Sequence, residues 1–106
     1  MTSPDTLSIR PMREGEEDKV IHLWQKSGLT RAYNNPARDV ALARTGPSSD
    51  ILVGLANDRI IAGVMVGHDG HRGNVYYVCA DPEAQGSGLG RAMMDAAETW
   101  LKERGV

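Results

Sequence analysis

The sequence has little of several features that would point to a particular class of protein. It contains one cysteine, so an internal disulfide is impossible and a reducing, cytoplasmic compartment is expected. Its 12 basic and 14 acidic residues leave a net charge of −2, which gives no electrostatic case for a nucleic-acid partner or an anionic membrane. Its apolar runs are too short to span a bilayer, and the N-terminus lacks the basic-then-apolar pattern of a signal peptide.

The remaining composition is that of a globular chain. Hydrophobic residues make up 41% and charged residues 25% of the sequence, which is ordinary for a folded domain. A chain of 106 residues is expected to form a single domain over residues 1–106 and to bury roughly 65% of its unfolded surface.

The rest of the chain is organised around residues 75–104. Residues 75–80 are β-branched, aromatic and uncharged, which predicts a buried strand. Asp81-Pro82 ends this strand, because proline cannot donate to a β-ladder. From Leu89 to Leu101 apolar residues recur at helical spacing without a proline, so strand, short loop and helix follow one another directly.

The loop between this strand and this helix is rich in glycine. It reads Gln85-Gly86-Ser87-Gly88-Leu89-Gly90-Arg91. Such a loop offers free backbone N–H groups at the positive end of a helix dipole, and glycine lets an anion approach closely, which predicts a phosphate cradle. A dinucleotide fingerprint would need glycine in place of Arg91, and a P-loop would need Lys-Ser or Lys-Thr after its last glycine. The alternative is a glycine-rich turn that binds nothing.

The spacing Gln85-x-x-Gly88-x-Gly90 resembles the [RQ]-x-x-G-x-[GA] motif of the GNAT superfamily of acetyl-coenzyme A-dependent N-acetyltransferases. The resemblance implies that acetyl-CoA is the cosubstrate, that no metal is needed, and that an amine is the acceptor in a direct transfer. It also implies which residues bind the coenzyme. Backbone groups of Val78, Cys79 and Ala80 would line the pantetheine and the acetyl carbonyl, and the loop would hold the pyrophosphate through Gly86, Ser87, Gly88, Leu89, Gly90 and Arg91, with Gln85 and Arg91 bracing it.

The order of elements along the chain agrees with the resemblance. The sequence predicts a strand near residues 7–12, a helix over about 14–27, a weaker helix over about 36–44, a hairpin of strands at 51–56 and 60–66, and then the strand at 75–80. This is the order of the first two-thirds of a GNAT domain, an α/β (α+β) fold whose mainly antiparallel sheet is flanked by helices. Short bacterial members of the YpeA-like type are most similar, on the segments Leu23-Trp24, Asn34-Asn35-Pro36 and Gly70-His71-Arg72-Gly73.

A complete member of the superfamily continues after this helix with a strand, a fourth helix and two closing strands. We therefore expect a truncated domain without the strand that completes the pantetheine wedge and without the helix that often carries the acid for the leaving thiolate. Low turnover of this chain is expected to follow. The alternatives are a non-catalytic acyl-CoA-binding or interaction module and a structural domain whose loop has no ligand.

Acyl transfer to an amine needs a group that removes the proton of the amine. No carboxylate lies between residues 75 and 80. Polar candidates near this strand are Tyr76, Tyr77, His68, Asp69 and His71, with Tyr33 and Asn34 on the substrate side. His71 is the first choice for the base, because imidazole titrates near neutral pH, and Tyr77 is the second catalytic candidate. The alternative for His71 is a solvated loop histidine. His68 and His71 are too few to predict a metal, and Cys79 is better explained as a small buried side chain than as a nucleophile.

Assembly is predicted from the same strand. If residues 75–80 lie at an edge of the sheet, no charge or proline discourages pairing with a second chain. Trp100 and Leu101 are expected to stay partly exposed, so a homodimer through the strand edge or the helix end is predicted. Three kinds of acceptor are equally consistent with the sequence: a small-molecule amine, a peptide N-terminus and a protein lysine.

Overall fold

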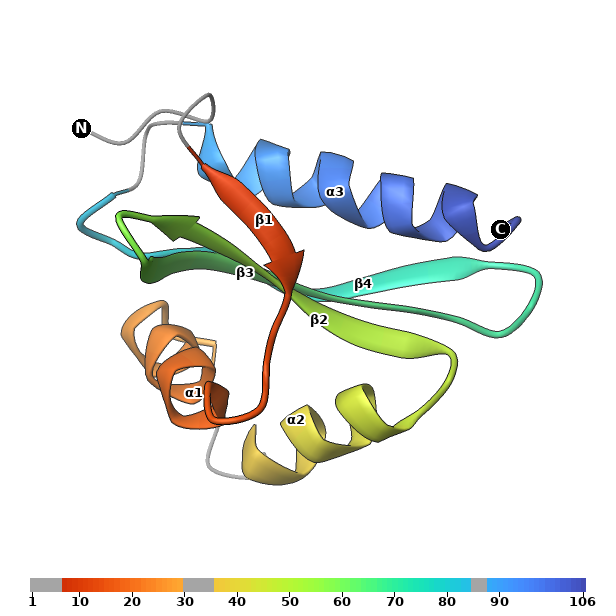
Figure 1. The fold of residues 1–106 in the computed structure, drawn as a ribbon, viewed down its shortest axis with the longest axis horizontal. Helices are drawn as coiled ribbons and strands as arrows, with labels where there is room; N and C mark the ends of the chain where they lie inside the picture. Colours follow the sequence, from red (N-terminus) through yellow and green to blue (C-terminus); the bar gives the residue numbers. More distant parts are fainter. Residues whose placement is uncertain (1–6, 30–35, 85–87) are drawn as a thin grey trace.

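The computed structural model describes residues 7–29, 36–84 and 88–106. The elements follow the predicted order (Figure 1): β1 (Ser8–Pro11), α1 (Glu17–Lys26), α2 (Pro36–Thr45), β2 (Ser49–Ala56), β3 (Arg59–His68), β4 (Gly73–Ala80) and α3 (Leu89–Glu103). The predicted element types are confirmed. Both hairpin strands are longer than expected, because pairing between β2 and β3 continues outward to Ser49 and Gly67.

The four strands form one antiparallel sheet in the order β1-β2-β3-β4. The turn between β2 and β3 is tight, with Asn57 at φ 51° and Asp58 at φ 63°. Two successive left-handed residues give the turn a twist that matches that of the flanking strands. Within the described residues β4 pairs with β3 alone and is an edge strand.

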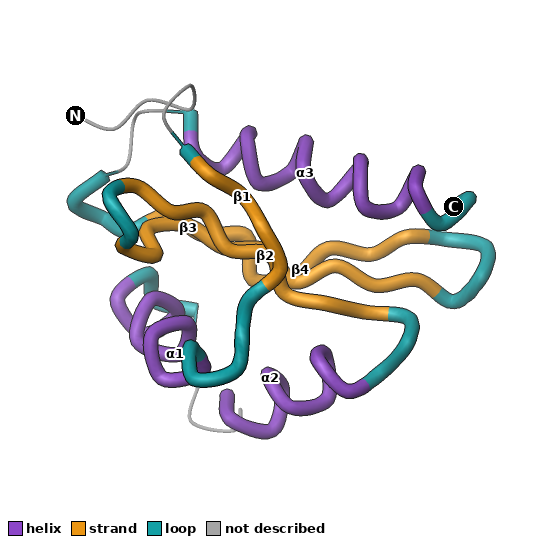
Figure 2. Tube along the Cα trace, in the orientation of Figure 1, coloured by secondary structure: helices purple, strands orange, loops and turns teal. Residues whose placement is uncertain are grey.

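Helices cover both faces of the sheet (Figures 1 and 2). Helix α3 packs on one face through Leu89, Met93, Ala97 and Trp100, while α1 and α2 lie on the other face. The core on the α1 side is centred on Trp24, which is fully buried.

Two predictions about burial are wrong. Residues 75–80 do not form a uniformly buried strand: Cys79 and Ala80 are buried, but Tyr76 is 55% exposed, because an edge strand has a neighbour on one side. Trp100 was expected to stay partly exposed and is 6% exposed. The guanidinium of Arg104 lies 3.7 Å above its ring centroid and helps to cover it.

In the part of the chain that the structure describes, no helix combines the length and the hydropathy needed to cross a bilayer.

Candidate functional site

The centre of β4 is interrupted by a β-bulge. Gly63 pairs with Cys79 and Met65 with Tyr76, so one residue of β3 faces two residues of β4, Tyr77 and Val78. Tyr77 has φ 53°, a left-handed conformation that is uncommon for a bulky side chain. A bulge bends its strand and redirects the residues that follow it. Here those residues include Cys79 and Ala80, where the sequence predicts coenzyme contacts.

The side chain of Tyr77 holds this bulge in place. Its ring stacks on Trp24 with centroids 3.9 Å apart and planes 10° apart, and its hydroxyl donates a 2.7 Å hydrogen bond to Asp39 Oδ2. A left-handed residue costs about 1–2 kcal/mol. An aromatic pair contributes about 0.5–1.5 kcal/mol, and a hydrogen bond to a charged group about 1.5–3 kcal/mol. The two contacts therefore outweigh the backbone strain and tie β4 to α1 and α2.

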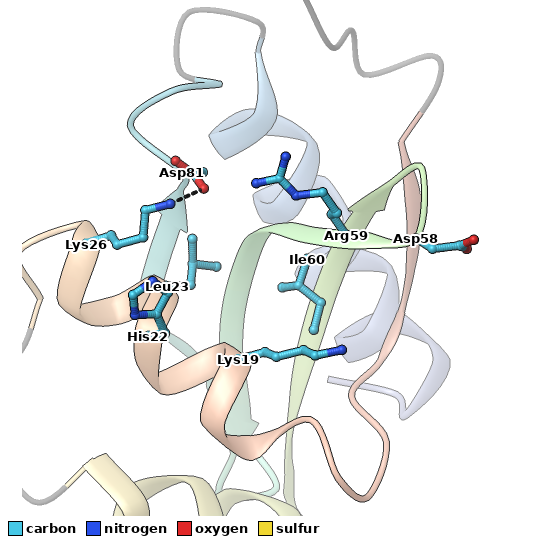
Figure 3. Close-up of a pocket in the computed structure, with 8 residues that line it drawn as sticks. All are labelled: Lys19, His22, Leu23, Lys26, Asp58, Arg59, Ile60 and Asp81. Atoms are coloured by element: carbon cyan, nitrogen blue, oxygen red, sulfur yellow. Dashed lines mark hydrogen bonds and ion pairs between the residues drawn. The ribbon is translucent and has the colours of Figure 1, made fainter.

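The end of β4 is fixed by Asp81. Asp81 is 4% exposed, and its carboxylate accepts a hydrogen bond from Lys26 Nζ at 2.8 Å (Figure 3). The carboxylate also accepts from the Glu83 N–H at 3.0 Å, and the Asp81 N–H donates to the Ile61 carbonyl at 2.7 Å. The hydrogen bond from Lys26 holds the pKa of Asp81 below its usual range, and the positive charge of Arg59 acts in the same direction. Asp81 therefore ends the strand, as predicted, and also joins the start of the loop to α1.

The first turn of α3 suits a ligand anion. Gly88 is the N-cap residue and has φ 74°, a conformation that favours glycine. A β-carbon added to Gly90 would meet no atom within 4 Å, so packing inside the described structure does not require glycine there. Acidic residues stand in the first turns of α1 and α2, whereas the first turn of α3 has none. Its N–H groups therefore face no carboxylate from their own turn.

The predicted coenzyme residues fall into three groups. Val78, Cys79 and Ala80 end β4, and the Ala80 carbonyl accepts a hydrogen bond from Ser27 Oγ at 3.3 Å. Four of the loop residues, Gly88, Leu89, Gly90 and Arg91, begin α3. The other three, Gln85, Gly86 and Ser87, lie outside the described residues.

Two side chains in these groups have limited chemistry. Leu89 is 2% exposed and packs in the core, so its backbone alone is available to a ligand. Burial raises the pKa of the Cys79 thiol to about 12, which leaves no thiolate near neutral pH. The prediction that Cys79 is a small buried side chain is confirmed.

His71 lies at the other end of β4. It is exposed in the turn before Gly73, where its N–H donates to Asp69 Oδ1 at 2.9 Å. Val78 is five residue steps along β4 from Gly73, a span of about 16 Å at the usual rise of a strand. The structure therefore brings Tyr77 to the bulge but does not bring His71 beside it. Within the described residues, no three metal-ligating side chains gather into a site.

Sequence reasoning missed the two long-range contacts that shape this site. Asp39 and Tyr77 are 38 residues apart, and Lys26 and Asp81 are 55 residues apart. Neither pair has a local spacing signal, because each forms when α1 and α2 pack on the sheet.

The sequence model of the acetyltransferase (GNAT) family matches residues 10–106. The chain belongs to the GNAT acetyltransferase family. The prediction made from the loop motif is thereby confirmed at the level of the family.

Solved structures show the same fold. The ribosomal-protein-S18-alanine N-acetyltransferase of Escherichia coli superposes with a TM-score of 0.78 at 20% identity, over 94% of this chain and 62% of that enzyme. An aminoglycoside acetyltransferase from an uncultured soil metagenomic sample, in complex with sisomicin, superposes with a TM-score of 0.77 at 16% identity. The superposition covers 95% of this chain and 73% of that enzyme. A GNAT acetyltransferase of Brucella melitensis, in complex with acetyl-CoA, superposes with a TM-score of 0.77 at 17% identity, over 94% of this chain and 71% of that protein.

The chain thus spans 62% of the length of the Escherichia coli enzyme. At 20% identity or less, these likenesses concern the fold. They confirm the predicted architecture, an antiparallel sheet between helices.

Proposed function

We propose that the protein binds acetyl-CoA where β4 meets α3 and transfers the acetyl group directly to a primary amine. Family membership supports acetyl-CoA-dependent acetyl transfer in general terms. The observation that carries the proposal for this chain is the start of α3, where Gly88 is left-handed, Gly90 has open space above it and the first turn has no carboxylate. These features favour a pyrophosphate held by the amides of the loop from Gln85 to Arg91.

The acetyl group is proposed to lie against the backbone after the bulge. There the backbone of Val78, Cys79 and Ala80 would orient the pantetheine and polarise the acetyl carbonyl in the manner of an oxyanion hole. The buried thiol of Cys79, whose pKa is about 12, argues for direct transfer to the amine rather than through an acyl-cysteine.

The catalytic groups are also proposals. His71 is the predicted base and Tyr77 the second candidate. Because the Tyr77 hydroxyl donates to Asp39, its first effect is on the geometry of the bulge. A His71→Asn variant with unchanged dependence of kcat on pH would remove His71 from the mechanism, since an essential base leaves its pKa in that profile.

The acceptor is proposed as a primary amine without a narrower class. Two of the similar enzymes named above act on different kinds of acceptor by name, one on an alanine of a ribosomal protein and the other on an aminoglycoside.

We further propose that two copies pair through the outer edge of β4, which carries no charge between residues 73 and 80. A monodisperse monomer in light scattering at micromolar concentration would end the dimer proposal. A cytoplasmic location stays a prediction from the single cysteine.

Binding and turnover need separate measurements. Calorimetry with acetyl-CoA tests the coenzyme site, and release of coenzyme A in the presence of a panel of amines tests transfer. Binding with turnover supports the enzyme. Saturable binding without turnover on any amine would favour the alternative of a catalytically impaired acyl-CoA-binding module. Absence of binding by folded protein would refute both.

A further inference from the structure

A second concave site lies on the other side of Asp81, between α1 and the β2–β3 turn. It is a cavity of about 290 Å³, lined by Lys19, His22, Leu23, Lys26, Asp58, Arg59, Ile60 and Asp81 (Figure 3). The four residues from α1 are spaced at i, i+3, i+4 and i+7, so they share one face of the helix. The tight turn at residues 57–58 fixes the position of the opposite wall.

The charges around this cavity are unbalanced. Lys19, Lys26 and Arg59 contribute three positive charges, although the whole chain has a net charge of −2. Asp81 faces them and pairs with Lys26, whereas the carboxylate of Asp58 points away from the group (Figure 3). Among the lysine, arginine and aspartate side chains that face the cavity, three positive charges against one negative charge leave an excess of two positive charges.

Two of the three cations are not in a close ion pair. Within the part of the chain that the structure describes, the side chains of Lys19 and Arg59 make no hydrogen bond or salt bridge, although the charge of Arg59 acts on Asp81. The floor between them is apolar, because Leu23 is 3% exposed and Ile60 is partly buried. A guanidinium and two ammonium groups above an apolar floor match a small organic dianion, with the anion against the cations and carbon against the floor.

We propose that this cavity binds the phosphate monoester of a small organic phosphate. A monoester carries about −1.5 to −2 charge at pH 7, which matches the excess of two positive charges, whereas a phosphodiester carries a single charge. The cavity is near the lower end of small-ligand sites, so the organic part is small or extends into solvent. The described residues that line the cavity come from α1, from the turn between β2 and β3 with the start of β3, and from Asp81, and none of them belongs to α3.

The proposal is tested without the coenzyme, by an amide NMR titration of the full chain with phenyl phosphate at a pH above the second phosphate pKa of about 6. We expect saturable shifts at residues 59 and 81 with one common Kd. Arg59→Gln and Lys19→Gln should each weaken binding about tenfold, which corresponds to about 1.4 kcal/mol. Methyl phenyl phosphate, the matched diester, should bind about tenfold more weakly to the unmodified chain.

The matched control is Lys102→Gln, which removes one positive charge from α3 on the opposite face of the sheet and should leave the Kd unchanged. Both variants are expected to fold, because Arg59 and Lys19 are exposed. Amide spectra of the free variants verify that each is folded. Three results would overturn the proposal: no saturable shift, an Arg59→Gln variant that binds as tightly as the unmodified chain, or an equal loss in Lys102→Gln.

The monoester has two possible sources, and a comparison of coenzyme A with 3′-dephospho-coenzyme A separates them. If coenzyme A binds more tightly and Arg59→Gln removes this advantage, the cavity holds the 3′-phosphate of the coenzyme. If the two coenzymes bind equally while phenyl phosphate still shifts the amide signals of residues 59 and 81, the site belongs to a separate phosphorylated ligand. A failure of coenzyme binding at α3 leaves the phenyl phosphate titration unaffected.

Discussion

Replacement of Gly90 by alanine should separate the stability of the fold from the binding of the coenzyme. Gly90 is the second residue of α3, it does not have a left-handed φ, and an added β-carbon would meet no atom within 4 Å. Alanine is favoured over glycine in a helix by about 0.8–1.0 kcal/mol in the interior, and less in the first turn. We expect the variant to be more stable by about 0.5 kcal/mol, which raises its Tm by about 2–4 °C.

The same methyl group should obstruct the coenzyme. It would occupy the space through which the pyrophosphate is proposed to approach the backbone amides. Loss of one charge-assisted hydrogen bond costs about 1.5–3 kcal/mol, so Kd for acetyl-CoA should rise about 10- to 100-fold. The expected result is a variant that is more stable alone and binds less tightly.

Thermal unfolding with and without acetyl-CoA measures both quantities on one sample, because a ligand of the native state raises Tm according to its concentration and Kd. Gly88→Ala is the contrasting variant. With φ 74° its alanine costs about 1–2 kcal/mol, so both stability and binding should fall. A Gly90→Ala protein that is more stable and still binds acetyl-CoA as tightly as the unmodified chain would refute the loop assignment.

Three other predictions concern single side chains. Paired hydrogen bonds from Arg10 lower the pKa of Glu16 to about 2, well below its unfolded value of about 4.3. The pair therefore stabilises the fold above about pH 4.3 and loses this effect as pH falls toward 2. In a circular dichroism titration, the Arg10→Met variant should begin to unfold in acid at a higher pH than the unmodified chain. Cys79 should resist iodoacetamide at pH 8 in the native protein and react in urea, as followed by intact mass, because its pKa is about 12; rapid native labelling would contradict its burial. Tyr77→Phe removes the hydrogen bond to Asp39 and should lower the free energy of unfolding by about 1.5–3 kcal/mol in urea titrations, whereas an unchanged midpoint would show that the contact is not stabilising.

The fold was largely predictable from local signals. The periodicity of apolar residues and the strand end at Asp81-Pro82 depend on neighbours in sequence, so they place strands and helices to within a few residues. The start of α3 at Leu89 follows from the same logic, since Gly88 is the left-handed residue before it.

The geometry of the site was less predictable, because it depends on contacts between distant segments. Nothing local marks Tyr77 as left-handed, since aromatic residues ordinarily favour extended strands. Its conformation follows from the stack on Trp24 and the hydrogen bond to Asp39, which exist only after α1 and α2 have packed. Trp100 was misjudged because its ring packs into the core cluster formed with the sheet, and Arg104, one helical turn further on, covers it as well.

Helix α1 has a larger part in the site than its sequence suggested. Its C-terminal end makes three contacts with β4 and the residue that follows it. Trp24 stacks on Tyr77, and Ser27, just after the helix, donates to the Ala80 carbonyl. Lys26 pairs with Asp81, which directly follows β4. These contacts reach the bulge, the last strand residue and the residue that begins the loop. An edge strand lacks the second ladder that would hold a central strand straight. In this fold α1 supplies that support, so the position of the proposed acetyl and pyrophosphate sites depends on how α1 packs against the sheet.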